Sequence, residues 1–205
     1  MSHAPPNRIR EHVGLILAAG ASSRMGSPKS LLTYPDGTRL AEDQIRRMRS
    51  GGCRDVWLVV GAKADAILEQ LPELPCAFNP DWETGRWSSV QVGLLSAGIA
   101  KGYLILPVDT PGVSPETIAT LLKAADQSEV MALRPSYQGH PGRLLWISKT
   151  LRDQLLSATN AREKRLDHWV TPYQEVLPVD DPAILNNINT PQEWTRYLDG
   201  LKNED

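Results

Sequence analysis

Short apolar runs alternate along this chain with segments of helical periodicity, and this alternation restricts the fold more than any other feature of the sequence. Four runs have the character of strands buried on both faces: His12–Leu17, Val56–Gly61, Tyr103–Val108 and Val130–Leu133. Such runs joined by helices are typical of βαβ units, whose parallel sheets are covered on both faces. The sequence therefore predicts an α/β fold, a three-layer sandwich around a mostly parallel, Rossmann-like sheet.

Helices are predicted between and after these strands from apolar residues spaced three and four apart. The apolar stripes are Ala41, Ile45 and Met48; Ala64, Ile67, Leu68 and Leu71; Val90, Leu94 and Ala97; and Ile118, Leu121, Leu122 and Ala125. Ser114 and Pro115 supply a cap and a first turn for the last of these. After about residue 134 the pattern is less regular, with a helix near Lys149–Ser157, a strand at Gln174–Val179 and a final helix from the capping box Thr190–Glu193.

Length and charge set the scale of the protein and argue against some partners. The 205 residues suit one domain spanning 1–205, with the ends 1–8 and 199–205 expected to be frayed. The net charge of −2 argues against a surface built for nucleic acid. No stretch resembles a signal peptide or approaches the roughly 18 apolar residues of a membrane span. We therefore expect a cytoplasmic protein without nucleic-acid or membrane partners.

The segment "LAAGASSRMGSPKSLL" (residues 17–32) follows the first strand and combines small residues with two cations, Arg24 and Lys29. Its spacing matches neither the Walker phosphate loop nor the G-x-G-x-x-G dinucleotide loop. Small residues let backbone N–H groups approach a ligand closely, and the cations can neutralise phosphates. Composition alone is equally compatible with a surface loop whose two cations are solvated.

Five segments in a fixed order resemble the MobA-like NTP transferase family, the molybdenum cofactor nucleotidyltransferases. They are "LAAGASSRMGSPKSLL" (17–32), "NPDWETGRWSSVQVGL" (79–94), "LPVDTP" (106–111), "GHP" (139–141) and "NINTPQEW" (187–194). Leu17–Gly20 and Pro28–Lys29 are more similar to the cytidylyltransferase branch than to the guanylyltransferase branch, whereas Thr110 differs from the residue often found there. Both the base and the acceptor therefore stay open. The resemblance implies the fold of the nucleotide-diphospho-sugar transferases.

The resemblance also implies that Arg24, Lys29 and Asp109 are catalytic. The two cations would clamp the triphosphate of an NTP, and Asp109 would bind Mg²⁺ (or Mn²⁺) at the carboxyl end of a central strand. Asn187 and Asn189 share a face if the segment is extended, and they would complete the metal site. The alternatives are an aspartate that caps the next turn and asparagines that form ordinary turn bonds. Part of the family has aspartate at one or both asparagine positions, which leaves direct ligation open.

Nucleotide contacts are implied for the first loop and the second segment, at Leu17, Ala18, Ala19, Gly20, Arg24, Lys29, Asn79, Gly85, Ser88 and Ser89. Ser88 and Ser89 would open the helix that carries Val90, where exposed N–H groups can hold a base edge or a phosphate. Simple N-capping by Ser88 is the alternative.

Acceptor contacts are implied for the segment Gly139, His140 and Pro141, with a surface histidine in a tight turn as the alternative. Arg162, Lys164 and Arg165 offer either a basic rim or a solvated helix face.

The predicted reaction moves an NMP, CMP in preference to GMP, from an NTP to the phosphate of molybdopterin, with release of pyrophosphate and dependence on magnesium. A molybdoenzyme could receive the product. Two alternatives stay open. One is the same chemistry on a sugar phosphate, phospholactate or choline phosphate, and the other is a nucleotide-binding cofactor chaperone without turnover.

Overall fold

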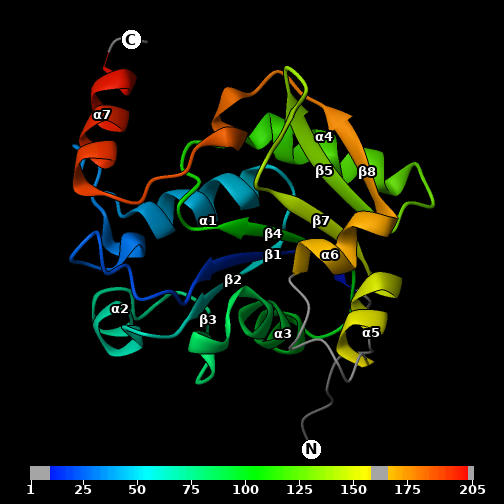
Figure 1. The fold of residues 1–205 in the computed structure, drawn as a ribbon, viewed down its shortest axis with the longest axis horizontal. Helices are drawn as coiled ribbons and strands as arrows, with labels where there is room; N and C mark the ends of the chain where they lie inside the picture. The colour runs from blue at the N-terminus through cyan, green and yellow to red at the C-terminus, as the bar shows by residue number, and fades with distance from the viewer. Residues whose placement is uncertain (1–9, 158–165, 203–205) are drawn as a thin grey trace, which may run out of the picture.

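The computed structural model describes residues 10–157 and 166–202 as a three-layer α/β fold built on an eight-stranded sheet (Figure 1). The strands are β1 (Arg10–Ala18), β2 (Asp55–Val60), β3 (Cys76–Phe78), β4 (Ala100–Pro107), β5 (Ala132–Tyr137), β6 (His140–Pro141), β7 (Leu145–Ser148) and β8 (Gln174–Pro178). The helices are α1 (Leu40–Ser50), α2 (Ala64–Gln70), α3 (Arg86–Ala97), α4 (Pro115–Asp126), α5 (Lys149–Ser157), α6 (Leu166–Val170) and α7 (Pro191–Leu201). Short 3₁₀ helices are η1 (Lys29–Leu31), η2 (Trp82–Thr84), η4 (Thr171–Tyr173) and η5 (Pro182–Leu185). Within these ranges no helix is both long and apolar enough to cross a membrane.

The sheet has two differently paired halves. Its strand order is β3-β2-β1-β4-β7-β5-β6, and β8 pairs with β5. The strands β3, β2, β1 and β4 are parallel, with Ile16 of β1 opposite Leu58 of β2 and Leu106 of β4. By contrast, β7 is antiparallel to both β4 and β5, while β8 is parallel to β5. The predicted α/β sandwich is confirmed, and the antiparallel β7 is a departure from the largely parallel sheet.

Both faces of the sheet are buried by alternating side chains. On β1, Val13 and Leu15 belong to one apolar core, and Ile16 and Ala18 belong to the other. Figure 1 shows α3 and α5 covering the first face and α1 and α4 covering the second. Leu94 of α3 is fully buried in the first core, and burial of a leucine side chain contributes roughly 1.5–3 kcal/mol. These two cores fix the sheet that positions the site.

Helix starts follow the predicted capping residues. Ser114 Oγ accepts from the N–H of Thr117 at 3.1 Å before α4, and Thr190 and Glu193 form a capping box at the start of α7. A side-chain cap contributes about 1 kcal/mol. The predicted helix Lys149–Ser157 is α5.

Some boundaries differ from those expected. The predicted strand Val130–Leu133 corresponds to β5, which begins two residues later and continues to Tyr137. The short strands β3, β6 and β7 were not predicted, because two to four residues give no periodic signal. Of the predicted frayed end 199–205, residues 199–201 belong instead to α7, which continues to Leu201, and residues 203–205 lie outside the described residues. The other predicted frayed end, 1–8, and the basic residues Arg162, Lys164 and Arg165 lie outside the described residues, and the single-domain extent stays a prediction.

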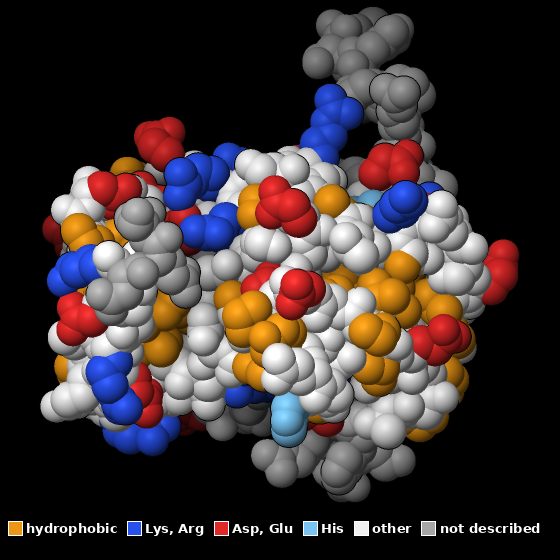
Figure 2. Space-filling model, turned by 90° about the horizontal axis from the view of Figure 1, so that it is seen from above, with side chains coloured by type: hydrophobic (Ala, Val, Ile, Leu, Met, Phe, Trp, Pro, Cys, Tyr) orange, Lys and Arg blue, Asp and Glu red, His pale blue; other side chains and the backbone are white. Residues whose placement is uncertain are grey.

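Charged side chains of both signs are mixed on the surface. On the face seen in Figure 2, Lys and Arg side chains are interspersed with Asp and Glu rather than gathered in one field. This mixing agrees with the net charge of −2. A polyanionic backbone gains little attraction from such a face.

Candidate active site

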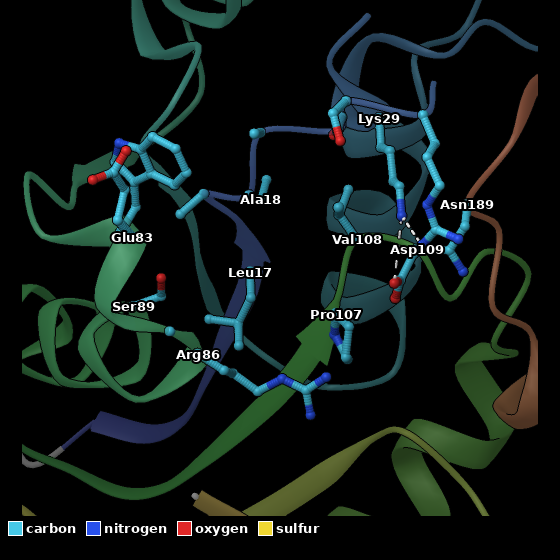
Figure 3. A pocket seen from close by; sticks show the side chains of 18 residues that line it. Leu17, Ala18, Lys29, Glu83, Arg86, Ser89, Pro107, Val108, Asp109 and Asn189 are labelled. Atoms are coloured by element: carbon cyan, nitrogen blue, oxygen red, sulfur yellow. Dashed lines mark hydrogen bonds and ion pairs between the residues drawn. The ribbon is translucent and has the colours of Figure 1, made fainter. Parts of the chain in front are cut away.

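A pocket of about 450 Å³ lies at the carboxyl ends of β1 and β4 (Figure 3). It is lined by Leu17, Ala18, Ala19, Gly20, Ala21, Ser22, Ser23, Arg24, Lys29, Trp82, Glu83, Gly85, Arg86, Ser89, Pro107, Val108, Asp109 and Asn189. The two strand ends are joined because the N–H of Val108 donates to the carbonyl of Leu17 at 3.1 Å. Open α/β sheets bind ligands at this edge, and the volume is typical of small-molecule sites.

The loop after β1 lines the pocket with small residues from Ala19 to Ser23. Ser22 has a φ of 51° and Gly26 a φ of 77°. The N–H groups of Met25 and Gly26 both donate to the carbonyl of Ser22, at 2.9 and 3.2 Å. The N–H groups of residues 20–24 donate to no acceptor in the part of the chain that the structure describes. Successive amides of this kind form a concave site for anions.

Lys29 connects this loop to the rest of the site. Its Nζ donates to Asn189 Oδ1 at 2.8 Å and lies 3.5 Å from Asp109 Oδ2, contacts that Figure 3 marks with dashed lines. Burial lowers the pKa of Lys29, an effect that Asp109 opposes and that the charge of Arg24 reinforces. Arg24 itself is exposed and lines the pocket. The structure therefore brings together the predicted residues Arg24, Lys29, Asp109 and Asn189.

Asp109 accepts hydrogen bonds from side chains rather than from the next turn. One guanidinium nitrogen of Arg143 donates to both carboxylate oxygens, at 3.1 and 3.3 Å. The backbone carbonyl of Asp109 accepts from the N–H of Ile188 at 2.8 Å, which joins the asparagine segment to the end of β4. Within the described chain the carboxylate accepts from no backbone amide, so it does not cap the turn.

The two asparagines lie on one side of their extended segment, as the spacing predicted. Asn189 Nδ2 donates to Asn187 Oδ1 at 2.9 Å. The backbone N–H of Asn189 donates to Glu193, the same carboxylate that completes the capping box of α7. Asn189 lines the pocket, whereas Asn187 is exposed and does not. The start of α7 therefore orients Asn189, and Asn187 supports it from outside.

Asn79 is buried behind the pocket wall rather than in it. Its Nδ2 donates to Ser88 Oγ at 3.0 Å and to Ser89 Oγ at 2.9 Å, and its Oδ1 accepts from the N–H of Asp81. Of these predicted nucleotide contacts, Ser89 and Gly85 line the pocket, while Asn79 and Ser88 do not. Asn79 thus holds the start of α3 in place.

The prediction that Ser88 and Ser89 open α3 is wrong by two residues. The helix begins at Arg86, because Gly85 has a φ of 108° that is readily accessible to glycine. Ser88 lies in the first turn, where its Oγ donates to the carbonyl of Gly85 at 2.9 Å. Simple N-capping by Ser88 is therefore excluded as well.

The predicted acceptor segment lies away from the pocket. Gln138 and Gly139, with φ of 49° and 80°, form the turn between β5 and β6. Gly139, His140 and Pro141 are exposed, and none of them lines the pocket. β6 lies on the edge of β5 that also pairs with β7, because β8 occupies the other edge, and the segment forms an exposed hairpin there rather than a wall of the pocket. The acceptor role of this segment stays a prediction.

Several residues at the site were not among the predicted ones, and four of them bring large or charged side chains. Trp82, Glu83 and Arg86 line the pocket, and Arg143 holds Asp109. Each of these residues lies inside or next to one of the five segments quoted above. The two arginines could have been found from the sequence, because each directly follows a glycine in or beside such a segment. Trp87, by contrast, is buried in the apolar core, as is usual for tryptophan.

The oxygen ligands present suit a cation that arrives with phosphate. No three His, Cys, Asp or Glu side chains of residues 10–157 and 166–202 group as a metal site. Asp109 supplies a carboxylate. The amide oxygen of Asn189 is close to it, because both groups contact the ammonium group of Lys29. Mg²⁺ typically takes one or two protein carboxylates and completes its shell with substrate phosphates. The donor set fits such an ion once Lys29 or Arg143 releases a carboxylate oxygen.

Comparison with known proteins gives a family and a fold. The profile described as the MobA-like NTP transferase domain matches residues 14–176. Nicotine blue oxidoreductase of Paenarthrobacter nicotinovorans is 37% identical over 201 residues, covering 90% of this chain and 95% of that protein. A probable molybdenum cofactor guanylyltransferase of Rhodopirellula baltica is 32% identical over 148 residues, covering 70% of this chain and 68% of that one.

A solved structure shares the architecture. The crystal structure of Rv0371c from Mycobacterium tuberculosis H37Rv superposes with a TM-score of 0.76 at 24% identity, covering 93% of this chain and 98% of that chain. At this identity the likeness concerns the fold.

Proposed function

This chain belongs to the MobA-like NTP transferase family, and from that premise we propose that it transfers an NMP from an NTP to the phosphate of molybdopterin and releases pyrophosphate. The observation that carries the proposal is the position of Lys29. Its Nζ contacts both Asp109 and Asn189, and it follows a loop whose amides at residues 20–24 donate to no acceptor within residues 10–157 and 166–202. That arrangement supplies charge neutralisation to a polyphosphate.

The loop after β1 would bind the triphosphate. Both reactants are polyanions, so the protein's main tasks are to neutralise charge and to align the attacking and leaving groups. The N–H groups of residues 20–24 would donate to phosphate oxygens, and Arg24 and Lys29 would carry the charge of the leaving pyrophosphate. The small residues of the loop let the ligand approach the backbone.

Asp109 and Asn189 would hold a divalent cation, magnesium or manganese, with Asn187 orienting Asn189. When bound, such an ion neutralises phosphate oxygens and fixes their orientation. Arg143 holds both oxygens of Asp109 in place. Asp109 must exchange one of these partners for the cation, so we expect metal affinity to rise when triphosphate draws Lys29 away.

For the nucleotide we propose CTP, on the loop Leu17–Gly20. The relative named as a guanylyltransferase makes GTP the competing substrate. Trp82 and Ser89 line the pocket and would contact the base and ribose. Ser89 lies on the wall opposite Lys29 in Figure 3. A sugar phosphate, phospholactate or choline phosphate is the competing acceptor. The product could pass to a molybdoenzyme, and we expect these events in the cytoplasm.

A nucleotide panel tests this proposal. Pyrophosphate release is measured with CTP, GTP, ATP and UTP, each with magnesium or manganese and with molybdopterin. We expect release with CTP, and loss of at least about 10³-fold in Asp109→Ala, because the phosphates then lose their metal-binding carboxylate. Asp65→Ala is the matched control, since Asp65 is an exposed carboxylate outside the pocket.

Other results would redirect the proposal. Pyrophosphate release with GTP alone would change the proposed nucleotide substrate from CTP to GTP. Release with a sugar phosphate, phospholactate or choline phosphate, but not with molybdopterin, would replace the acceptor. Nucleotide binding without turnover on any acceptor would favour a cofactor chaperone. Unchanged release in Asp109→Ala would remove Asp109 from the site.

A second candidate function is reduction of a small aromatic dye, because one family relative, 37% identical, is named nicotine blue oxidoreductase. A reduced nicotinamide dinucleotide contains a pyrophosphate and could occupy the same loop. It would deliver a hydride to the dye, and a proton from water would complete the reduction. The arrangement of Lys29 and Asp109 adds no support specific to hydride transfer, so this candidate stands second.

The two candidates are separated in one assay. The protein is incubated with nicotine blue and a reduced nicotinamide dinucleotide, and absorbance of both is followed. Bleaching of the dye with matching oxidation of the dinucleotide, together with no pyrophosphate release in the panel, would establish the second function. No change in either absorbance would eliminate it.

A further inference from the structure

Arg86 is a pocket cation that the proposed triphosphate site leaves unused. It is the first residue of α3, and its exposed side chain lines the pocket. Figure 3 shows this side chain extending from α3 toward Pro107, at the end of β4. In the same view Lys29 and Asp109 lie on the other side of that strand end. The pocket therefore has positive groups at two separate places.

The charge of Arg86 is not balanced by a carboxylate of residues 10–157 or 166–202, where it forms no ion pair. Burial lowers the pKa of neighbouring Arg134 on β5, Asp167 opposes that change, and the positive charge of Arg86 adds to it. Asp167 is already paired with Arg134 at 3.1 Å. Glu83 also lines this wall of the pocket, but among the described residues it forms no ion pair with Arg86. Arg86 therefore has a positive charge that a bound anion would pair with directly.

The position of Arg86 in its helix points the same way. A cation in the first turn is disfavoured by the helix dipole, whose positive end lies there. An anion bound by Arg86 would meet both the guanidinium and this end of α3, a helix of 12 residues. A guanidinium also matches a phosphate with two parallel N–H donors. The local electrostatics therefore favour an anionic ligand over an empty, solvated side chain.

The in-line geometry of nucleotidyl transfer assigns different ligands to the two positively charged regions of the pocket. In nucleotidyl transfer the attacking oxygen and the leaving pyrophosphate lie on opposite sides of the α-phosphorus. If Arg24 and Lys29 hold the pyrophosphate, the acceptor must approach from the side away from them. Arg86 lies on that side in Figure 3.

We propose that Arg86 binds the phosphomonoester group of the acceptor and so selects phosphorylated acceptors over their dephosphorylated forms. This inference rests on the proposed nucleotidyl transfer. The attacking atom is an oxygen of that same phosphate. It forms the new P–O bond as the bond to pyrophosphate breaks, and the guanidinium holds the other acceptor oxygens.

Direct binding tests the site without turnover. Tripolyphosphate first occupies the loop after β1, and inorganic phosphate is then titrated while both ligands are followed separately by ³¹P NMR. The variants are Arg86→Met, Arg86→Lys and Arg54→Met. Arg54 is the matched control, an exposed arginine outside the pocket that precedes β2, at the opposite edge of the sheet.

We expect Arg86→Met to weaken phosphate binding about tenfold to a hundredfold. Tripolyphosphate binding should stay unchanged, Arg86→Lys should retain part of the phosphate affinity, and Arg54→Met should match the wild type. In turnover, Arg86→Met should raise KM for molybdopterin and leave KM for the NTP unchanged. Equal phosphate binding in Arg86→Met, loss of tripolyphosphate binding instead, or no phosphate binding by the wild type would each overturn the inference. Arg86-dependent phosphate binding in a protein that transfers no nucleotide would leave the anion site standing and reject the proposed function.

Discussion

The two halves of the sheet contribute to the pocket in different ways. In the parallel half, each strand delivers its following loop to the same edge, and hydrogen bonds join the loops to one another. Ala62 N–H donates to Ala19 O at 3.0 Å, and Asn79 N–H donates to Val60 O at 2.8 Å. In the mixed half, β5 turns back through the exposed hairpin with β6, outside the pocket.

The mixed half reaches the site through the reversal of β7. Because β7 is antiparallel to β4, the residues before β7 lie at the same edge as the residues after β4. Arg143 therefore meets Asp109 across the junction of the two halves. The parallel half therefore builds the loops that line the pocket, while the mixed half supplies Arg143, which holds the carboxylate of Asp109.

Replacement of Lys29 should give a large effect, second only to that of Asp109, because Lys29 contacts both Asp109 and Asn189. We expect Lys29→Ala to lower kcat/KM for nucleotidyl transfer about 10²–10³-fold, the range for loss of one preorganised electrostatic partner. The measurement is pyrophosphate release at fixed metal and acceptor. Lys123→Ala, at an exposed lysine of α4 outside the pocket, should retain wild-type rates. A loss below about fivefold in Lys29→Ala would mean that the parallel half does not carry the chemistry.

The junction of the halves should be sensitive to added volume. A Cβ placed on Gly102 of β4 would lie 2.4 Å from Trp146 Nε1 of β7. We expect Gly102→Ala to lower the free energy of unfolding by about 1–3 kcal/mol through overpacking, measured by urea denaturation. Gly200→Ala is the control, because that glycine has open space in α7 and alanine favours helices. An unchanged urea midpoint in Gly102→Ala would show that β4 and β7 accommodate the added methyl group at little cost in stability.

The sequence predicted the parallel half well because that half has strong local signals. Three of its four strands are long apolar runs, and the loop after β1 and Asp109 at the end of β4 follow directly from the carboxyl-edge rule. The spacing of Asn187 and Asn189 likewise predicted their shared face.

The missed features depend on pairing, which a single sequence does not display. Nothing local shows that Leu145–Ser148 reverses between β4 and β5, so the approach of Arg143 to Asp109 was not foreseen. The expected use of Ser88 as a helix start failed because Gly85 starts the helix earlier through its positive φ. His140 was given an acceptor role by motif resemblance; it does not line the pocket, and that role stays a prediction.

Asn79 tests whether the parallel half positions its loops through buried hydrogen bonds. Asn79→Ala removes the donor to Ser88 and Ser89 and leaves both hydroxyls without it. We expect about 1–3 kcal/mol less stability and weaker nucleotide binding, since the start of α3 loses its fixed position. Thermal unfolding and calorimetric titration measure the two effects. Full stability together with wild-type affinity would show that α3 needs no such support.

The amino edge of the junction should respond to pH. His12 Nδ1 accepts from Trp146 Nε1 at 3.3 Å, and burial lowers the pKa of His12, with Asp126 opposing. A depressed pKa means that the unfolded chain binds the proton more readily, so stability holds above about pH 6.5, the usual histidine value, and falls as pH drops below it. His12→Gln should flatten this acid-side decline in the unfolding free energy.

The smallest effect is expected at the β5–β6 hairpin, and a large effect there would contradict the view that this hairpin takes no part in ligand binding. Because His140 is exposed and outside the pocket, His140→Ala should change the nucleotide dissociation constant by less than about twofold, as surface substitutions usually do. KM for molybdopterin should also stay unchanged if Arg86, rather than the hairpin, binds the acceptor phosphate. A selective rise in that KM would return the acceptor role to Gly139–Pro141. The mixed half would then take part in acceptor binding.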